Sequence, residues 1–340
     1  MKPIFRAVYV TDTHFRASNP RSRVDDYSNA VLAKFDWVVD YAIERRVDAI
    51  IHGGDWFDAF EASESVKIRL MQILIKARDR KIQVVTTPGS HDVHGYNLDT
   101  LGRASLGVLE AAGLVTVLRW GDSWIWMDPA EGDGVSVIGC PHTIDLDSEA
   151  DKYYIQRSGV DGFVILVAHG NLVDHELPQG FDHTRIEDVK VDADLVLSGH
   201  YHAGYPLHRR VDGVTFANPG SLARVDDSRR NRARVPSVCY IEVWPKTGGV
   251  RPPVTVDTVP VKIAADDVFG DKEPEVDDVL VDVSKLVDYF REETDAVGAT
   301  VDLDDMIQRV RLDGVDPGLV TRARVRVMEL IQQYRIEDDI

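Results

Sequence analysis

Residues 48–58 read DAIIHGGDWFD, an apolar run that breaks at two glycines and ends among carboxylates. The same form recurs as AVYVTDTH at 7–14, IQVVTTPGSHD at 82–92, GFVILVAHG at 162–170 and ADLVLSGHYH at 193–202. Apolar runs of about four to eight residues that are rich in β-branched side chains indicate strands buried on both faces. In each of the five segments, the polar residues therefore follow a buried strand at its carboxyl end.

Helical periodicity alternates with these runs. Two intervening stretches repeat apolar residues at helical spacing, namely Val31, Phe35, Val38 and Ala42 in one, and Val66, Leu70, Ile73, Leu74 and Ala77 in the other. From about 203 to 260 the chain changes to short strands with turn residues between them. We expect these strands to form a second, more antiparallel sheet. The predicted fold class is α/β, a two-sheet sandwich flanked by helices.

The chain divides into three predicted segments. Residues 1–262 form the main domain, and 263–279 an acidic linker, because ADDVFGDKEPEVDD at 265–278 is poor in hydrophobic residues. Residues 280–340 form a small helical C-terminal region with three amphipathic stripes, the last opening at Asp316 and Pro317. We expect this region either to cap its own domain or to dock on a partner.

Composition limits the function classes. No apolar run reaches eighteen residues, and the N-terminus MKPIFRAVYVTDTHF has no signal-peptide form, so we expect neither a membrane span nor export. The two cysteines are too few for a disulfide framework, which favours a cytoplasmic location. With 39 Lys and Arg against 57 Asp and Glu, the net charge of −18 opposes nucleic-acid binding unless basic residues cluster locally.

The polar clusters at the strand ends have the chemistry of a metal site. Carboxyl ends of strands converge on one crevice in an open α/β sheet. Residues two apart in an extended segment point the same way, so Asp12 can act with His14, and His200 with His202. Carboxylate and imidazole without thiolate suit Mn²⁺, Fe²⁺, Zn²⁺ or Mg²⁺.

Each motif alone has a plainer interpretation. DTH and GHYH are typical of solvated turns, GGD is more often a simple turn, and AHG carries little information. The occurrence of all these motifs in this order, each after a buried strand, is hard to explain by chance. The sequence therefore predicts one metal site built from several strand ends.

The order DxH, GDxxD, G-[NS]-HD, H and GHxH resembles the calcineurin-like metallophosphoesterases over roughly residues 5–245. HGGDWFD followed by VVTTPGSHD is most similar to the SbcD-type DNA-repair nucleases, whose archaeal and eukaryotic relatives are the Mre-eleven subunits. The resemblance implies two divalent metal ions, with Mn²⁺ ahead of Fe²⁺, Zn²⁺ and Mg²⁺. It implies that the metal ligands are Asp12, His14, Asp55 and His202 for the first ion, and Asp55, Ser90, His169 and His200 for the second. It also implies that His91 is a catalytic imidazole, with Asp92 positioned to orient it.

Two positions depart from the family pattern. The family has Asn where this chain has Ser90, and a hydroxyl is a shorter and weaker ligand, so we expect a second metal bound less tightly or through water. Asp58 stands where relatives place His, and we expect it either to orient a ligand or to contact substrate. The six histidines outside the clusters are expected to be structural or solvated: His52, His94, His142, His175, His183 and His208. Two of them, His52 and His94, are the exceptions to watch because they flank the ligand clusters in sequence.

Arginines cluster in two places near the predicted site. RVDDSRRNRAR at 224–234 holds Arg224, Arg229, Arg230, Arg232 and Arg234, and the first metal motif is followed by Arg16, Arg21 and Arg23. These eight residues are the candidate DNA-binding set, because arginines contact the phosphate backbone without reading sequence. The alternative is a solvated loop.

Three functions follow from these features. The first is a Mn²⁺-dependent DNA exonuclease or endonuclease in repair or recombination; the resemblance adds an SbcC-type ATPase partner, which residues 280–335 would contact, and a homodimer. The second keeps the metals but takes a cyclic nucleotide or another small phosphodiester, or a phosphomonoester, which the net charge favours. The third is a DNA-binding scaffold whose catalysis is weak because of Ser90.

Overall fold

The computed structural model describes residues 2–128, 134–157, 162–177, 182–225, 227, 229–246, 253–262 and 268–269. The side chains of Arg229 and Arg230 are not among the parts described. Of the predicted linker, 263–279, only Val268 and Phe269 are described, and the predicted helical region, 280–340, lies outside the described residues.

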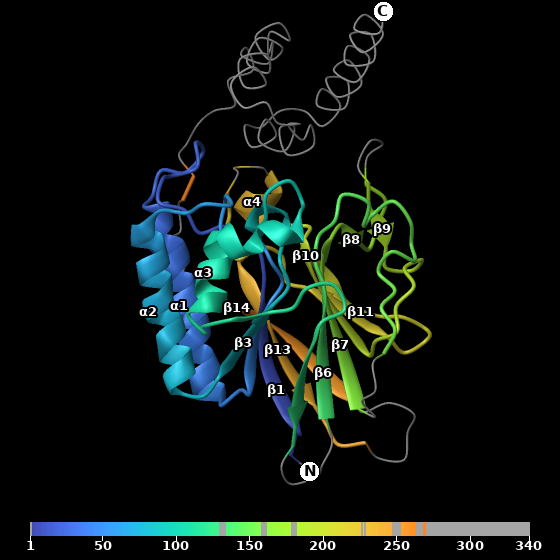
Figure 1. Cartoon of the computed structure of the whole chain (residues 1–340). Helices are drawn as coiled ribbons and strands as arrows, with labels where there is room; N and C mark the ends of the chain where they lie inside the picture. The colour runs from blue at the N-terminus through green and yellow to red at the C-terminus, as the bar shows by residue number, and fades with distance from the viewer. Residues whose placement is uncertain are drawn as a thin grey trace, which may run out of the picture.

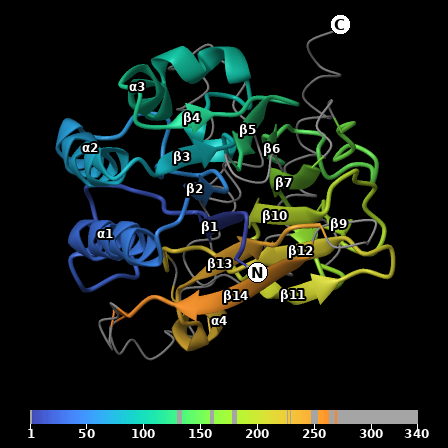
Figure 2. The ribbon, with the colours of Figure 1, turned by 90° about the horizontal axis from the view of Figure 1, so that it is seen from below.

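Two six-stranded sheets pack face to face, as Figures 1 and 2 show. The first has the order β14-β13-β1-β2-β3-β4, with bounds Val254–Pro260, Ser237–Val243, Phe5–Val10, Ala49–His52, Gln83–Thr86 and Thr116–Val117. The second has the order β11-β12-β10-β7-β6-β5, with bounds Tyr205–Arg209, Thr215–Asn218, Leu195–His200, Gly162–Gly170, Gly134–Cys140 and Ser123–Met127. A small ribbon pairs β8 (Leu172–Val173) with β9 (Thr184–Arg185).

The membership of the two sheets corrects one expectation. We expected the strands from 203 to 260 to form the second sheet together, but β13 and β14 join the first, where β13 runs antiparallel to β1 with Phe5 opposite Val243. The centre of the second sheet is instead the parallel set β6, β7 and β10. Cys239 and Ile241 of β13 are buried in the core between the sheets. Because strands of both sheets bury the same kind of side chain there, composition does not reveal which sheet a strand joins.

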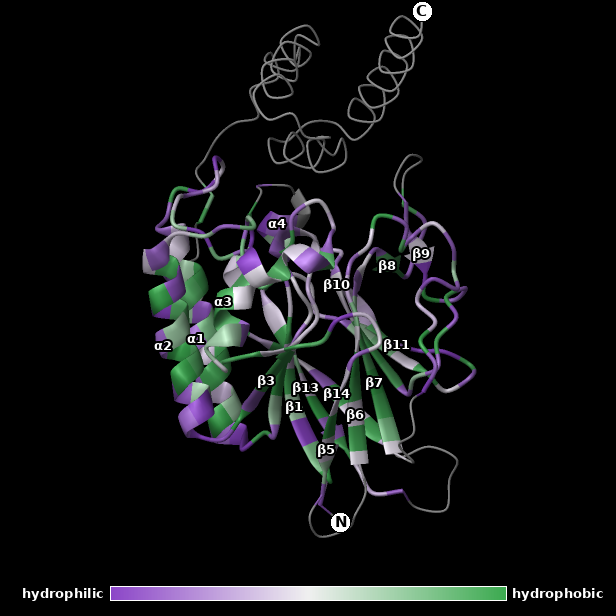
Figure 3. Ribbon diagram, in the orientation of Figure 1, coloured by the Kyte–Doolittle hydropathy of each residue, from purple (hydrophilic) through white to green (hydrophobic). Residues whose placement is uncertain are grey.

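Helices cover the outer face of the first sheet. These are α1 (Tyr27–Arg45), α2 (Glu64–Asp79) and the short α3 (Ser105–Ala111), visible at one side of the sandwich in Figure 2. The predicted α1 stripe of Val31, Phe35, Val38 and Ala42 is fully buried against this sheet. Figure 3 shows hydrophobic residues concentrated on the strands and on the inward side of these helices. The helical periodicity is thus confirmed.

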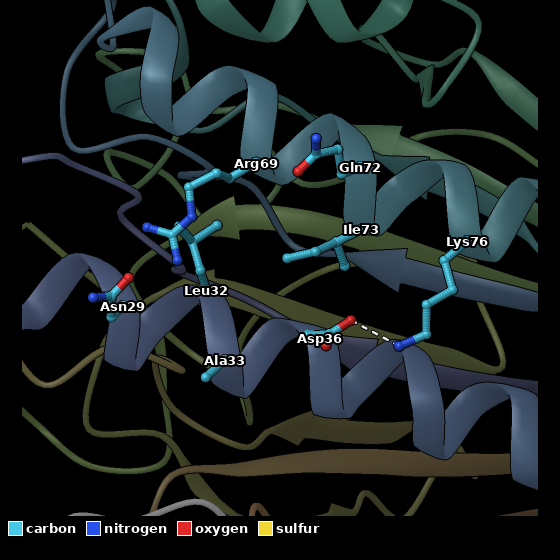
Figure 4. Close-up of a pocket in the computed structure, with 8 residues that line it drawn as sticks. All are labelled: Asn29, Leu32, Ala33, Asp36, Arg69, Gln72, Ile73 and Lys76. Carbon is cyan, nitrogen blue, oxygen red and sulfur yellow. Dashed lines mark hydrogen bonds and ion pairs between the residues drawn. The ribbon is translucent and has the colours of Figure 1, made fainter.

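The two long helices are also joined at their solvent-facing edge. Figure 4 shows the groove between α1 and α2, in which Lys76 of α2 reaches across to Asp36 of α1. The Lys76 amine lies 2.8 Å from Asp36 and 2.6 Å from Asp40. The Asp26 side chain caps α1 by accepting a hydrogen bond from the Asn29 amide at 3.0 Å.

The parallel strands β1, β2 and β3 end at one edge of the first sheet, and β6, β7 and β10 at the corresponding edge of the second. The chain after β3 carries the short helices η1 (Ser90–Asp92) and η2 (Leu98–Arg103), and α4 (Arg229–Ala233), near the top of Figure 1, follows β12. No helix among the described ranges is long and apolar enough to cross a membrane.

Candidate metal centre

The loops after β1 and β2 run side by side and present three of the predicted ligands. The Asp12 amide donates to the Gly54 carbonyl and the His14 amide to the Asp55 carbonyl, each at 3.1 Å. Asp12, His14 and Asp55 all have positive φ, at 52°, 43° and 54°. Residues other than glycine rarely adopt this left-handed backbone conformation. Such strain is typical of functional sites whose surroundings hold the backbone firmly in place.

Four side chains form the first ligand group: Asp12, His14, Asp55 and His202. The Nε2 atoms of His14 and His202 lie 3.0 Å apart. Asp12 Oδ1 is 3.5 Å from His202 Nε2, and Asp55 Oδ2 is 3.8 Å from His14 Nε2. Asp12, His14 and Asp55 are almost fully buried, whereas His202 is half-buried.

Asp55 also belongs to a second group, with His169 of β7 and His200 of β10. His169 Nε2 lies 3.2 Å from Asp55 Oδ2. On its other side, His169 Nδ1 lies 2.7 Å from the Gly53 carbonyl, which only accepts, so Nδ1 carries a proton. His200 has a φ of 74°, and its amide donates to Asp12 Oδ1 at 3.1 Å.

Both groups fit divalent cations. Ligands of one ion with bonds of about 2.1 Å stand about 3 to 4.2 Å apart, and the separations in the first group lie in this range. Without a cation, the facing Nε2 atoms of His14 and His202 can share only one proton, and His169 Nε2 is a buried atom with no hydrogen-bond partner. Two ions that share Asp55 would satisfy these atoms.

The charges of the ligands agree with this fit. Burial lowers the pKa of His14 to about 4 and that of His200 well below its usual value, which keeps both imidazoles neutral. Burial alone would raise the pKa of Asp55, but neighbouring His169 and His91 hold it well below the usual range. Burial alone would lower the pKa of His169, but Asp55 and Asp12 raise it to about 9, so a cation bound at Nε2 would displace a proton. Neutral imidazoles and ionised carboxylates are the protonation states that metal binding requires.

Two glycines make room for these ligands. A Cβ on Gly54, whose φ is +96°, would collide with His169 Nδ1, and one on Gly89 would collide with the Asp55 carboxylate. The ligands could not approach the backbone so closely at any other residue type.

Ser90 and His91 lie on the open side of the centre. Ser90 Oγ is 3.4 and 3.5 Å from the two Asp55 carboxylate oxygens, long for a hydrogen bond between oxygens. The His91 amide donates to Asp55 Oδ1 at 2.9 Å, and its ring centroid lies 5.0 Å from that of His14. His91 Nδ1 is 2.9 Å from the Asp58 carbonyl, so it carries the ring proton and the lone pair is on Nε2.

Asp92 has a different task from the one we expected. Its buried carboxylate accepts hydrogen bonds from the backbone amides of Asp55 and Gly89 at 2.9 Å and of Trp56 at 3.0 Å. The imidazole of His91 is held instead by the Asp58 carbonyl. Asp92 therefore ties the loop after β2 to the loop after β3, and does not orient His91 directly.

Asp58 faces the outer side of His14. Its Oδ1 is 3.7 Å from His14 Nδ1, and its Oδ2 accepts from Arg16 at 2.6 Å. Asp58 is thus placed to orient a ligand, one of the two roles we left open. Arg16 is occupied by this pairing and by Ser18.

His142 is the residue beside the centre that the sequence did not single out. It follows β6, and its ring lies 4.9 Å from His200 and 6.1 Å from His169. The sequence signal was present, because CPHT also follows a buried strand at its carboxyl end. His52, by contrast, stacks on Trp56 at 3.9 Å and bonds Thr13 and the Gly54 amide, so its role is structural.

The arginines do not form one open surface. Arg23 and Arg224 are only 4% and 8% exposed, which corrects the expectation that they form part of a solvent-facing DNA contact. Arg234 donates to the carbonyls of Ser221 and Ala223, while Arg21 and Arg232 are exposed. The side chains of Arg229 and Arg230 lie outside the described residues.

Residues 5–204 match the family model described as calcineurin-like phosphoesterase, and this span contains both ligand groups. The chain belongs to the calcineurin-like phosphoesterases. Members are metal-dependent hydrolases of phosphate esters, and the paired ligand groups in this phosphoesterase agree with a two-ion centre.

Curated relatives are similar over the same domain. The DNA double-strand break repair protein Mre11 of Sulfolobus acidocaldarius is 25% identical over 223 residues, which cover 65% of this chain and 53% of that protein. The protein of the same name from Haloferax volcanii is 26% identical over 270 residues, which cover 78% of this chain and 56% of that protein. The phosphoesterase thus spans about half the length of these relatives.

Among solved structures, a dimetal phosphatase from Danio rerio is similar to this chain with a TM-score of 0.44 and 11% identity. The match covers 76% of this chain and 100% of that one.

Proposed function

We propose that this phosphoesterase is a two-metal phosphodiesterase that cleaves DNA. The observation that carries the proposal is the pair of ligand groups that share Asp55, with His91 beside them on the open side. The resemblance of the motifs to SbcD-type nucleases and the two relatives named Mre11 favour DNA as the substrate.

The chain's residues have distinct tasks in this proposal. Two bound divalent ions, with Mn²⁺ first among the candidates, would supply an activated water and neutralise charge that develops on the phosphate. Asp55 would bind both ions, and the nearly complete burial of Asp12, His14 and His169 fixes the positions of these side chains. His91 stands at the partly exposed rim with Nδ1 held by the Asp58 carbonyl, so that Nε2, when protonated, could donate to the scissile phosphate or to the leaving oxygen.

A smaller phosphodiester, such as a cyclic nucleotide, is the second candidate. The net charge of −18 and the burial of Arg23 and Arg224 favour it, because both weaken attraction to a polyanion. For DNA, the exposed Arg21 and Arg232 are the proposed backbone contacts.

The proposed assembly follows the resemblance: a homodimer that acts with an SbcC-type ATPase through residues 280–335, which lie outside the described residues. The cytoplasmic location stays a prediction. Cys140 and Cys239 are both buried and unpaired.

Hydrolysis of linear DNA, a cyclic nucleotide and a chromogenic phosphodiester, measured with Mn²⁺ and again with excess chelator, tests the proposal. We expect chelator-sensitive cleavage of DNA. A matched His91→Gln variant should lose activity by about 10²- to 10⁴-fold while it still binds metal. Cleavage of the cyclic nucleotide alone would select the second candidate. DNA binding without cleavage of any substrate would leave only the weakly catalytic scaffold.

A further inference from the structure

A group of four cations lies behind the loop that carries Asp12 and His14, and the metal centre does not use it. We call Arg23, Lys34, Arg224 and Arg234 the cation cluster. Lys34 of α1 is 3% exposed, and Arg23 and Arg224 are similarly buried. The cluster adjoins the ligand loop, because the Ala223 amide bonds the Asp12 carbonyl and Arg23 packs on Tyr27, whose hydroxyl bonds the His14 carbonyl.

The charges of the cation cluster are poorly balanced. Asp25 pairs with Arg23 through bonds of 2.7 and 2.6 Å, and Arg234 donates to backbone carbonyls. Lys34 Nζ and Arg224 Nε are buried and have no hydrogen-bond partner. Within the described part of the chain, neither Lys34 nor Arg224 forms an ion pair with a carboxylate.

Such an arrangement is costly without a ligand. Burying a charged amine with no partner is unfavourable, and arginine cannot relieve the repulsion by losing its proton. Burial, followed by the charges of Arg23, Arg224 and Arg234, lowers the pKa of Lys34 to about 7. Deprotonation of Lys34 would reduce the charge but would leave buried N–H groups without an acceptor. An anion that accepts hydrogen bonds would balance the positive charge and would also give these N–H groups an acceptor.

Phe269 forms one wall of the cluster. The guanidinium carbons of Arg23, Arg224 and Arg232 lie 5.5, 5.6 and 5.3 Å from its ring centroid. The Val24 amide donates to the Val268 carbonyl at 3.1 Å, which holds this segment in place. The ring contacts the guanidinium groups without offering them an acceptor, and its exclusion of water strengthens their attraction for an anion.

We propose that the cation cluster binds an oxyanion of the phosphate class through Lys34 Nζ and the Arg224 guanidinium. A tetrahedral phosphate presents several oxygens to donors from different directions, and its two negative charges match the excess positive charge better than a halide does. The site is separate from the metal centre and does not depend on the proposed nuclease function.

The test uses the full-length chain stripped of metal with chelator, so that phosphate cannot bind through metal ions. Binding of inorganic phosphate is measured by calorimetry and by the shift in thermal midpoint, against sodium chloride of equal ionic strength. We expect phosphate to raise the midpoint of the wild type. Lys34→Met should weaken phosphate binding about tenfold or more, since it removes a charged hydrogen bond. Lys76→Met, which removes an amine from the α1–α2 groove, is the matched control and should bind phosphate like the wild type.

An oligonucleotide without terminal phosphates separates two sources of the oxyanion. If it competes with phosphate, and more strongly after Phe269→Ala, the ligand is a nucleic-acid phosphate; if it does not compete, the ligand is the free ion. Either result upholds the site. No phosphate effect on the wild type, or equal phosphate affinity in Lys34→Met and wild type, would overturn it. Arg224→Gln provides the same comparison should Lys34→Met fail to fold.

Discussion

The carboxylate of Asp55 belongs to both ligand groups, and the backbone of this residue is fixed on both sides. Its amide donates to Asp92, its carbonyl accepts from His14, and its φ is 54°. Neighbours thus impose a conformation that an isolated aspartate would avoid. We expect a centre that exists before metal binds and does not have to fold around it.

Ser90→Asn should tighten the second ion, because an amide side chain reaches further than a hydroxyl and brings a carbonyl oxygen toward the site. The Mn²⁺ concentration for half-maximal binding of the second ion should fall, measured by calorimetry. Ser90→Ala is the control and should change it little, since a neutral hydroxyl is a weak metal ligand. Unchanged metal affinity in Ser90→Asn would remove Ser90 from the ligand set.

Lys34 should make stability depend on pH. Its pKa is lowered from 10.5 to about 7 in the folded chain, first by burial and then by the arginines of the cation cluster, so between these values the unfolded chain binds the extra proton. The part of the wild-type free energy of unfolding that depends on Lys34 should therefore rise with pH across this window. The free energy of unfolding of Lys34→Met should exceed that of the wild type most clearly near pH 7. This difference should shrink toward pH 10.

Urea unfolding in phosphate-free buffer with chelator measures this difference. Lys76→Met serves as control. Burial alone would lower the pKa of Lys76, but Asp36 and Asp40 together outweigh it and raise the pKa, so Lys76 stays protonated in the folded chain across the window. A stability difference between Lys34→Met and wild type that is flat across the window would show that Lys34 keeps its proton in the folded state.

At the scale of the residue, the sequence predicts the metal ligands better than it predicts the contacts that hold them in place. The sequence predicts four of the ligands because residues two apart in an extended segment point the same way and follow a strand. These are Asp12, His14, His200 and His202. The contacts of Asp92 with three amides depend on how separate loops meet in space. No local pattern encodes such contacts.

At the scale of elements, the centre is an outcome of parallel strand order. β1, β2 and β3 end side by side in one sheet and β7 and β10 in the other, so their loops meet at one edge of the sandwich. The helices were predictable because α1 and α2 bury a regular stripe. Sheet membership was not, since β13 pairs with the free edge of β1 more than two hundred positions away along the chain.

Asp92→Ala tests the tie between the loops after β2 and β3. Removing the carboxylate leaves three buried amides, those of Asp55, Trp56 and Gly89, without their acceptor. At about 1–3 kcal/mol for each orphaned group, the free energy of unfolding should fall by at least about 3 kcal/mol. Metal affinity should fall with it, because Asp55 loses its backbone support. Wild-type stability and metal affinity with reduced turnover alone would restore the orienting role for Asp92.

At the scale of the whole molecule, a net charge of −18 coexists with a buried group of cations. The metal ions would bring positive charge to the strand ends, and we expect binding of any phosphate ester there to depend on them more than on surface arginines. The chain spans about half the length of its Mre11 relatives, so partners and assembly remain proposals.

The central claim, that two cations share Asp55, is tested most directly by electron paramagnetic resonance of the chain titrated with Mn²⁺. Two Mn²⁺ ions bridged by one carboxylate at about 3.5–4 Å should give a spin-coupled signal at two equivalents per chain, and Asp55→Asn should abolish the coupling. A wild-type chain that binds a single Mn²⁺, or two without magnetic coupling, would contradict the account.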